Sequence, residues 1–133
     1  MTMITIDHLS VGVPDIAAGR AFYDQLLAPL EVNCLAAGDG FAAYGRDTIQ
    51  FLLLLPFDGG PATGGNGTHI GFAAPSREAV EAGHAAGLKA GGKDEGAPGE
   101  RAAYPMPGVF AAYVRDPWGN KIELIHGGFS VTR

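Results

Sequence analysis

The stretch FAAYGRD at residues 41–47 recurs as FAAYVRD at residues 110–116, with six identities in seven positions. A second match pairs HLSVGVPD at residues 8–15 with HIGFAAPS at residues 69–76. In each member of this pair, a proline follows the histidine by six positions, and a residue suited to capping a helix follows the proline. The two matches occur in the same order, which indicates an internal repeat.

A third match pairs TIQFL at residues 48–52 with KIELI at residues 121–125. The extra PWGN at residues 117–120 of the second half is a strong turn signal. We therefore predict a single domain in which each half is one copy of the repeat. The predicted divisions are one domain over 1–133, halves at about 1–57 and 67–127, and a glycine-rich linker at 58–66.

Each half follows the order β-α-β-β-β in its pattern of apolar and polar residues. Asp15 and Ser76 are expected to cap helices over 16–27 and up to about residue 86. The expected strands are 4–13, 31–35, 41–44 and 48–55, then 68–74, 89–93, 108–115 and 121–126. The glycine-rich segments 59–67 and 87–99 are expected mainly as loops. The predicted fold class is α+β, with two βαβββ modules in a pseudo-two-fold repeat forming a cupped mixed sheet around a metal site.

Side chains alternate between the two faces of a strand, and this sorts the polar residues of the repeat. Aliphatic neighbours are assigned to the helix-covered face, which leaves His8, His69, Gln50 and Glu123 on the other face. The repeat pairs His8 with His69 and Gln50 with Glu123. Two imidazoles and one carboxylate suit a divalent transition metal with open positions for a substrate. Gln50 is interpreted as a fourth, weaker donor or as a hydrogen-bonding wall residue.

Three other reactive side chains are assigned structural roles. His84 is expected to be solvated in the middle of its helix, and His126 should point away from Glu123 in a regular strand. Cys34, the single cysteine, has no activating partner in the sequence and is interpreted as a small buried residue.

Composition limits the classes of partner. Nine basic residues against fourteen acidic ones give a net charge of −5, which disfavours a nucleic-acid partner. The apolar run at residues 49–55 is too short to cross a bilayer, and the N-terminus lacks the pattern of a signal peptide. A single cysteine suits a reducing compartment. We expect a cytoplasmic protein with a small-molecule substrate, no nucleic acid and no membrane.

The sequence resembles the glyoxalase, bleomycin-resistance and dioxygenase superfamily, whose fold is called the vicinal-oxygen-chelate fold. The resemblance lies in three segments, IDHLSVGVPDIAAGRAFY at 6–23, THIGFAAP at 68–75 and YVRDPWGNKIELI at 113–125. The resemblance implies paired βαβββ modules, a central metal and a homodimer. It also implies His8, His69 and Glu123 as metal ligands, with Gln50 at the remaining position.

The resemblance leaves three kinds of function open. Glyoxalase I enzymes carry a carboxylate at the position matching Gln50, and an amide is not a useful base, so Glu123 alone would serve as ligand and base. A His-His-Glu set is similar to that of extradiol dioxygenases and fosfomycin-resistance transferases. A metal-free binding protein of bleomycin-resistance type is the third alternative. The expected cofactor is one divalent metal, which is Fe, Mn, Ni or Zn.

Several further residues are candidates for contact with the substrate. Tyr104 or Tyr113 would fill the tyrosine role of a dioxygenase, with cavity wall or core edge as the alternative. Tyr104 is the candidate catalytic residue beside Glu123, and Tyr113 and Ser10 are the candidate substrate-binding residues. The segment at residues 96–108 is expected to cover the mouth of the site or to form an ordered connection. A phosphonate would need a cationic pocket, and the sequence does not place Arg101, Arg115 and Lys121 in one.

Overall fold

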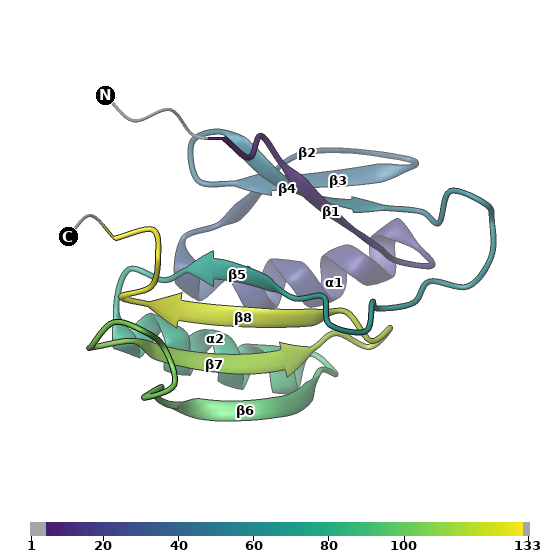
Figure 1. Ribbon diagram of the computed structural model, residues 1–133. Coiled ribbons are helices and arrows are strands. Elements are labelled where there is room, and N and C mark those ends of the chain that lie inside the picture. Colours follow the sequence, from purple (N-terminus) through teal and green to yellow (C-terminus); the bar gives the residue numbers. More distant parts are fainter. Residues whose placement is uncertain (1–4, 132–133) are drawn as a thin grey trace.

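The computed structural model describes residues 5–131 and contains two copies of one βαβββ arrangement (Figure 1). The first module consists of β1 (Leu9–Gly12), α1 (Ile16–Leu27), η1 (Ala28–Leu30), β2 (Asn33–Gly38), β3 (Phe41–Gly45) and β4 (Ile49–Leu54). The second consists of β5 (Ile70–Ala73), α2 (Arg77–Lys89), β6 (Lys93–Glu100), β7 (Phe110–Arg115) and β8 (Lys121–His126). The predicted repeat and the α+β class with two βαβββ modules are confirmed. In the described part of the chain, no helix has the length and apolar character needed to span a membrane.

Each module forms its own four-stranded mixed sheet. The strand orders are β1-β4-β3-β2 and β5-β8-β7-β6. The first strand of each module pairs in parallel with the last, and the remaining pairs are antiparallel. The same topology therefore occurs twice, and the last strand of each module lies in the middle of its sheet.

The helix caps agree with the sequence, whereas the glycine-rich segment after α2 does not. The side chains of Asp15 and Ser76 accept hydrogen bonds from Ala18 N and Ala79 N at 2.8 and 3.1 Å. Helix α2 continues to Lys89, so the predicted strand at 89–93 is wrong. Instead β6 occupies Lys93–Glu100 as an edge strand, because its backbone pairs with β7 without needing apolar side chains. The first strand is also shorter than the expected 4–13, and residue 4 lies outside the described residues.

The two helices pack against each other between the modules, and one hydrophobic core includes residues from both. The approach is close at Gly83 of α2. A Cβ atom there would lie 2.9 Å from Leu30 Cδ1 and 2.7 Å from Leu124 Cδ1, so a side chain at this position would collide with the core. The helix-covered faces of both sheets therefore share one interior, which leaves the opposite faces open.

Polar side chains also join the modules. Asp116, at the start of the turn between β7 and β8, is 2 % exposed and accepts a 2.7 Å hydrogen bond from the Tyr23 hydroxyl of α1. The same carboxylate accepts from the backbone N–H groups of Trp118 and Asn120 and from the side-chain amide of Asn120. That amide also donates to Gly12 O at 3.0 Å. The turn of the second module is thus fixed to α1 and β1 of the first.

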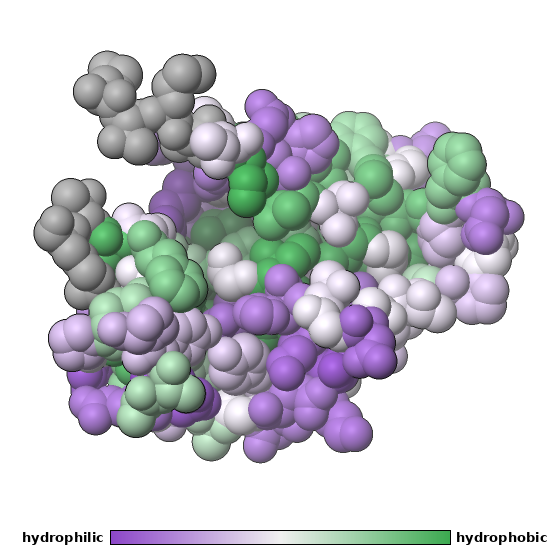
Figure 2. Space-filling model, viewed as in Figure 1, coloured by the Kyte–Doolittle hydropathy of each residue, from purple (hydrophilic) through white to green (hydrophobic). Residues whose placement is uncertain are grey.

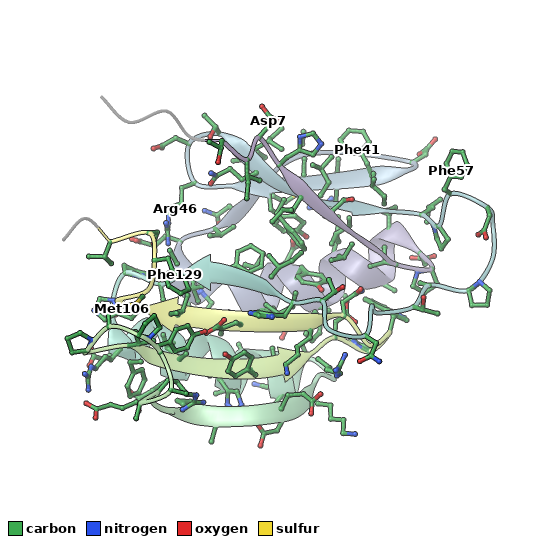
Figure 3. The ribbon with its side chains drawn as sticks, in the orientation of Figure 1. Asp7, Phe41, Arg46, Phe57, Met106 and Phe129 are labelled. Atoms are coloured by element: carbon green, nitrogen blue, oxygen red, sulfur yellow. The ribbon has the colours of Figure 1, made fainter. Side chains whose placement is uncertain are left out.

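Arg46 makes a second polar link, at the opposite end of β1. Its guanidinium donates to Leu30 O at 3.0 Å and to Ala73 O of β5 at 2.5 Å. The side chain lies between the first sheet and β5 (Figure 3). The two modules are therefore connected by hydrogen bonds on both sides of the shared core.

The Tyr23–Asp116 hydrogen bond gives a test of this connection. We expect Tyr23→Phe to lower the free energy of unfolding by about 1.5–3 kcal/mol, because the lost bond is buried and has a carboxylate acceptor. Urea denaturation measures the change. Tyr44→Phe is the matched control, since its hydroxyl bonds to the half-exposed Asp24, and the expected loss is smaller. Equal stability of Tyr23→Phe and the parent protein would contradict this account.

Candidate functional site

A buried carboxylate on β8 lies at the centre of the candidate site. Glu123 is 2 % exposed, and its Oε1 lies 3.1 Å from His69 Nε2. Its Oε2 accepts a hydrogen bond from the Tyr104 hydroxyl, which lies 3.1 Å from the Tyr113 hydroxyl. We call these four residues, His69, Tyr104, Tyr113 and Glu123, the Glu123 cluster.

Neighbouring strands and one loop position the cluster. Glu123 lies directly opposite Tyr113 of β7 and Gly71 of β5. Gly71 leaves space above the carboxylate, since a Cβ atom there would lie 3.7 Å from Glu123 Oε1. Tyr104 enters from the connection between β6 and β7, so the segment expected to cover the mouth does reach the carboxylate.

The C-terminal segment supports Tyr104 from the outside. The ring of Phe129 packs on the ring of Tyr104 with centroids 5.8 Å apart. Phe129 and Met106 lie at the same end of the second sheet (Figure 3). Phe129 itself is 75 % exposed, so this side of the site has a mostly open apolar surface.

Both phenols of the cluster remain protonated at neutral pH. Burial, and then the hydrogen bond to Glu123, raise the pKa of Tyr104 well above its usual value. Burial also raises the pKa of Tyr113, and the charge of Glu123 acts in the same direction. Tyr104 therefore keeps its proton and donates a hydrogen bond to the Glu123 carboxylate. This is an arrangement in which a proton can be held or passed within the cluster.

Two cations lie beside Tyr113, although the sequence could not place them. The Lys121 Nζ lies 5.0 Å from the centre of the Tyr113 ring, and the Arg101 guanidinium carbon lies 5.8 Å from it. The third candidate, Arg115, instead pairs with Glu95 and holds the pKa of that carboxyl below its usual range. The sequence did contain a feature that could have placed Lys121 beside the site. It lies two residues before Glu123, which puts both side chains on one face of β8.

His8 and Gln50 lie on the other sheet. His8 precedes β1, with its Nδ1 2.6 Å from Asp7 Oδ1. It lines a cavity of about 390 Å³ together with Gln50 and Arg46. Among residues 5–131, no three His, Cys, Asp or Glu side chains form a group that could hold a metal ion. Within one chain, the structure therefore joins His69 with Glu123 but does not bring His8 to them.

Comparison with known proteins identifies the fold. A family model for the Glyoxalase/Bleomycin resistance protein/Dioxygenase superfamily matches residues 5–124. The chain belongs to this superfamily. None of the curated proteins compared with this sequence matches it.

Solved structures of the superfamily agree with this assignment. A glyoxalase/bleomycin resistance protein from Albidiferax ferrireducens T118 is 40 % identical, with a TM-score of 0.81, and the match covers 92 % of this chain and 98 % of that one. A possible glyoxalase from Bacillus cereus is 26 % identical, with a TM-score of 0.64 and coverage of 92 % and 99 %. A glyoxalase-related enzyme from Fulvimarina pelagi is 17 % identical, with a TM-score of 0.72 and coverage of 94 % and 89 %, and it supports the fold alone.

The strand register corrects one equivalence between the two halves. Leu9 pairs with Phe51, whereas Ile70 pairs with Ile122. Because Leu9 and Ile70 each follow a repeated histidine, Phe51 is the equivalent of Ile122. The position equivalent to Glu123 is therefore Leu52. Gln50, which the sequence match had paired with Glu123, corresponds instead to Lys121.

The most similar sequence match is also displaced in the structure. In FAAYGRD, Tyr44 points into the core and its hydroxyl donates to Asp24 of α1. In FAAYVRD, Tyr113 points to the opposite face and contacts Tyr104. A shift of one residue along a strand exchanges its two faces. Identical residues of the repeat therefore have different roles in the two modules.

The remaining candidates have the following places. Ser10 is exposed and lines a hollow with Lys121 and Asn120, and no residue of the Glu123 cluster lines that hollow. His84, expected to be solvated, is 7 % exposed and bonds to Asp94 at 3.0 Å. His126 points away from Glu123, as expected, and its Nδ1 donates to Ala74 O. Cys34 is half-buried in β2.

Proposed function

We propose that this protein is a metal-dependent enzyme of the lyase or isomerase type, which holds two adjacent oxygens of a small substrate on a divalent metal. The Glu123 cluster is the observation that carries the proposal. A buried carboxylate and an imidazole nitrogen 3.1 Å apart are two ligands of the kind that Fe, Mn, Ni and Zn accept. This donor set fits half of a metal site.

The roles of the residues follow from their chemistry. His69 Nε2 and Glu123 Oε1 would hold the metal, which when bound would supply a positive charge to polarise the substrate oxygens. Tyr104 donates to the other carboxylate oxygen, Oε2, and orients the side chain. Glu123 is also the group able to accept a substrate proton, with the Tyr104 hydroxyl as the neighbouring donor.

A second copy of the chain would complete the site. His8 is on the first sheet, and the shared helical core leaves the open faces of both sheets free. A homodimer in which the first module of one protomer covers the second module of the other would bring His8 of the partner subunit to His69 and Glu123. An isologous pair of this kind contains the site twice.

The exposed surface of the first sheet supports a homodimer. Phe41 and Leu54 are cross-strand partners on its open face and are 36 % and 38 % exposed. Leu35 of β2 is 43 % exposed. Apolar residues gather over this sheet, whereas hydrophilic residues gather over the second (Figure 2). Open apolar surface of this kind marks an interaction site, and the incomplete ligand set favours another copy as its occupant.

Metal content tests the ligand assignment. We expect about one divalent ion per chain, with His8→Ala and Glu123→Gln each losing most of it, because each removes one of three strong ligands. Gln50→Ala is the matched control and should retain most of the metal, since the register does not pair Gln50 with Glu123. Elemental analysis of purified protein, with circular dichroism to check folding, gives the result.

The identity of the metal also decides among the alternatives. Iron at full occupancy would favour a dioxygenase over an isomerase. If the parent protein took up none of Fe, Mn, Ni or Zn, the enzyme proposal would be wrong and a metal-free binding protein would replace it.

Mixing two inactive variants tests whether two chains share the site. His8→Ala and Glu123→Gln chains, unfolded together and refolded in equal amounts, should regain about a quarter of the parental metal sites, because each mixed dimer contains one intact site. Each variant refolded alone is the control. If the site lay within one chain, mixing would restore nothing.

Substrate turnover tests the reaction class. With Ni, Zn or Mn added, the parent protein should isomerise the hemithioacetal of methylglyoxal or a glutathione-free analogue. We expect Glu123→Gln to lower kcat by at least about a hundredfold, because it removes both a metal ligand and the base. Absorbance of the product measures the rate. Absence of turnover with every metal would exclude the glyoxalase-type reaction while leaving metal binding intact.

A further inference from the structure

Arg101 and Lys121 form a cationic pair on either side of Tyr113, next to the Glu123 cluster. Lys121 lies on β8, and Arg101 follows β6 on the other side of β7. Both positive groups lie within 6 Å of the Tyr113 ring centre, at 5.0 and 5.8 Å. A strand-centred tyrosine thus separates two positive charges on the face that carries Glu123.

Among the described residues 5–131, neither cation forms a salt bridge, and Lys121 acts on Glu95 only through its charge. Every salt bridge in this range involves other basic groups, and Glu95 and Glu123 already have other partners. Glu95 is paired with Arg115, and Glu123 is bound by His69 and Tyr104. Arg101 donates only to the carbonyls of Ala97 and Glu100. In a chain with a net charge of −5, two cations without a salt bridge on the candidate site's own face need a physical reason.

Glycine provides the space that allows this arrangement. Gly96 of β6 is the cross-strand partner of Tyr113. A Cβ atom at Gly96 would lie 3.1 Å from Tyr113 Cδ2 and 3.4 Å from an Arg101 nitrogen. Because no side chain occupies this position, the guanidinium can lie beside the ring while the residue stays half-exposed.

We propose that Arg101 and Lys121 bind the acidic group of the substrate, so that the substrate is a small organic anion bearing a carboxylate or phosphonate. The proposal rests on the proposed function, because it assigns the substrate class of the same site. Arginine and lysine bind such oxygens through charge-assisted hydrogen bonds, and the planar guanidinium can make two at once.

The register limits the size of this substrate. Tyr113 and Glu123 are directly opposite each other, and cross-strand neighbours have Cβ atoms ~5 Å apart. An acidic group over Tyr113 therefore lies only a few bonds from oxygens bound near Glu123. This spacing favours a short oxoacid over a long peptide adduct.

Anion binding without metal tests the pair independently of the metal site. Isothermal titration or amide chemical-shift titration of the chelator-treated full chain would compare benzoate, phenylphosphonate and the neutral benzamide. We expect at least one of the two anions to bind about tenfold more tightly than benzamide, because only the anions gain charge-assisted bonds. The stronger of the two identifies a carboxylate or a phosphonate as the natural acidic group.

Matched variants assign the effect to these side chains. Lys121→Met and Arg101→Met keep apolar stems of similar length and should remove the preference for anions, while Lys89→Met, on the last turn of α2, should keep it. Equal binding of anions and benzamide by the parent protein would overturn the proposal. Loss of the preference in Lys89→Met to the same extent would do so as well, since net charge alone would then explain it.

Metal analysis of the same samples separates this proposal from the proposed function. If the parent protein binds metal but shows no preference for anions, the substrate class is wrong and the metal site stands. If it prefers anions but takes up no metal, the anion site stands and the metal-dependent enzyme is wrong. Lys121→Met and Arg101→Met should both retain the parental metal content, because neither residue is a ligand.

Discussion

The buried carboxylate of Asp116 is the interaction on which the rest of the structure depends. Four hydrogen bonds reach its two oxygens, from Tyr23, from Trp118 and from the backbone and side chain of Asn120. A carboxylate that is 2 % exposed is tolerated only when its oxygens are satisfied in this way. These bonds close the turn that begins β8 and tie it to the first module. They therefore fix the start of β8, the strand that carries Glu123.

The sequence predicts the repeat better than it predicts the site. The repeated histidines, the helix caps and the order of elements were all visible, because capping and strand alternation are local properties. The equivalence of Gln50 with Glu123 failed, since letter matching does not detect which residues pair across strands. Leu52 holds that position only through the register of β1 with β4. The edge strand β6 was missed for a related reason, because its glycines make backbone pairs without an apolar pattern.

The two modules have kept the same topology and divided the chemistry between them. The second module carries the carboxylate, both tyrosines and the two cations on its open face. The corresponding face of the first module carries Leu52, Leu54 and Phe41, with His8 at its end. Identical motifs support this division, because a displacement of one residue sends Tyr44 into the core and Tyr113 to the open face. One module is thus suited to hold polar groups of a substrate, and the other to cover its apolar part.

This division explains why one chain would not be sufficient for the proposed chemistry. Packing α1 against α2 at Gly83 stabilises the chain by burying both helix-covered faces in one core. The same packing keeps the polar open face of the second module from contacting the apolar open face of the first within one chain. A buried charge gains strength in a site from which water is excluded, and the His69 side chain beside Glu123 is still 45 % exposed. An apolar sheet from a second protomer would supply that exclusion and His8 together, which links the stability of the assembly to the electrostatics of its site.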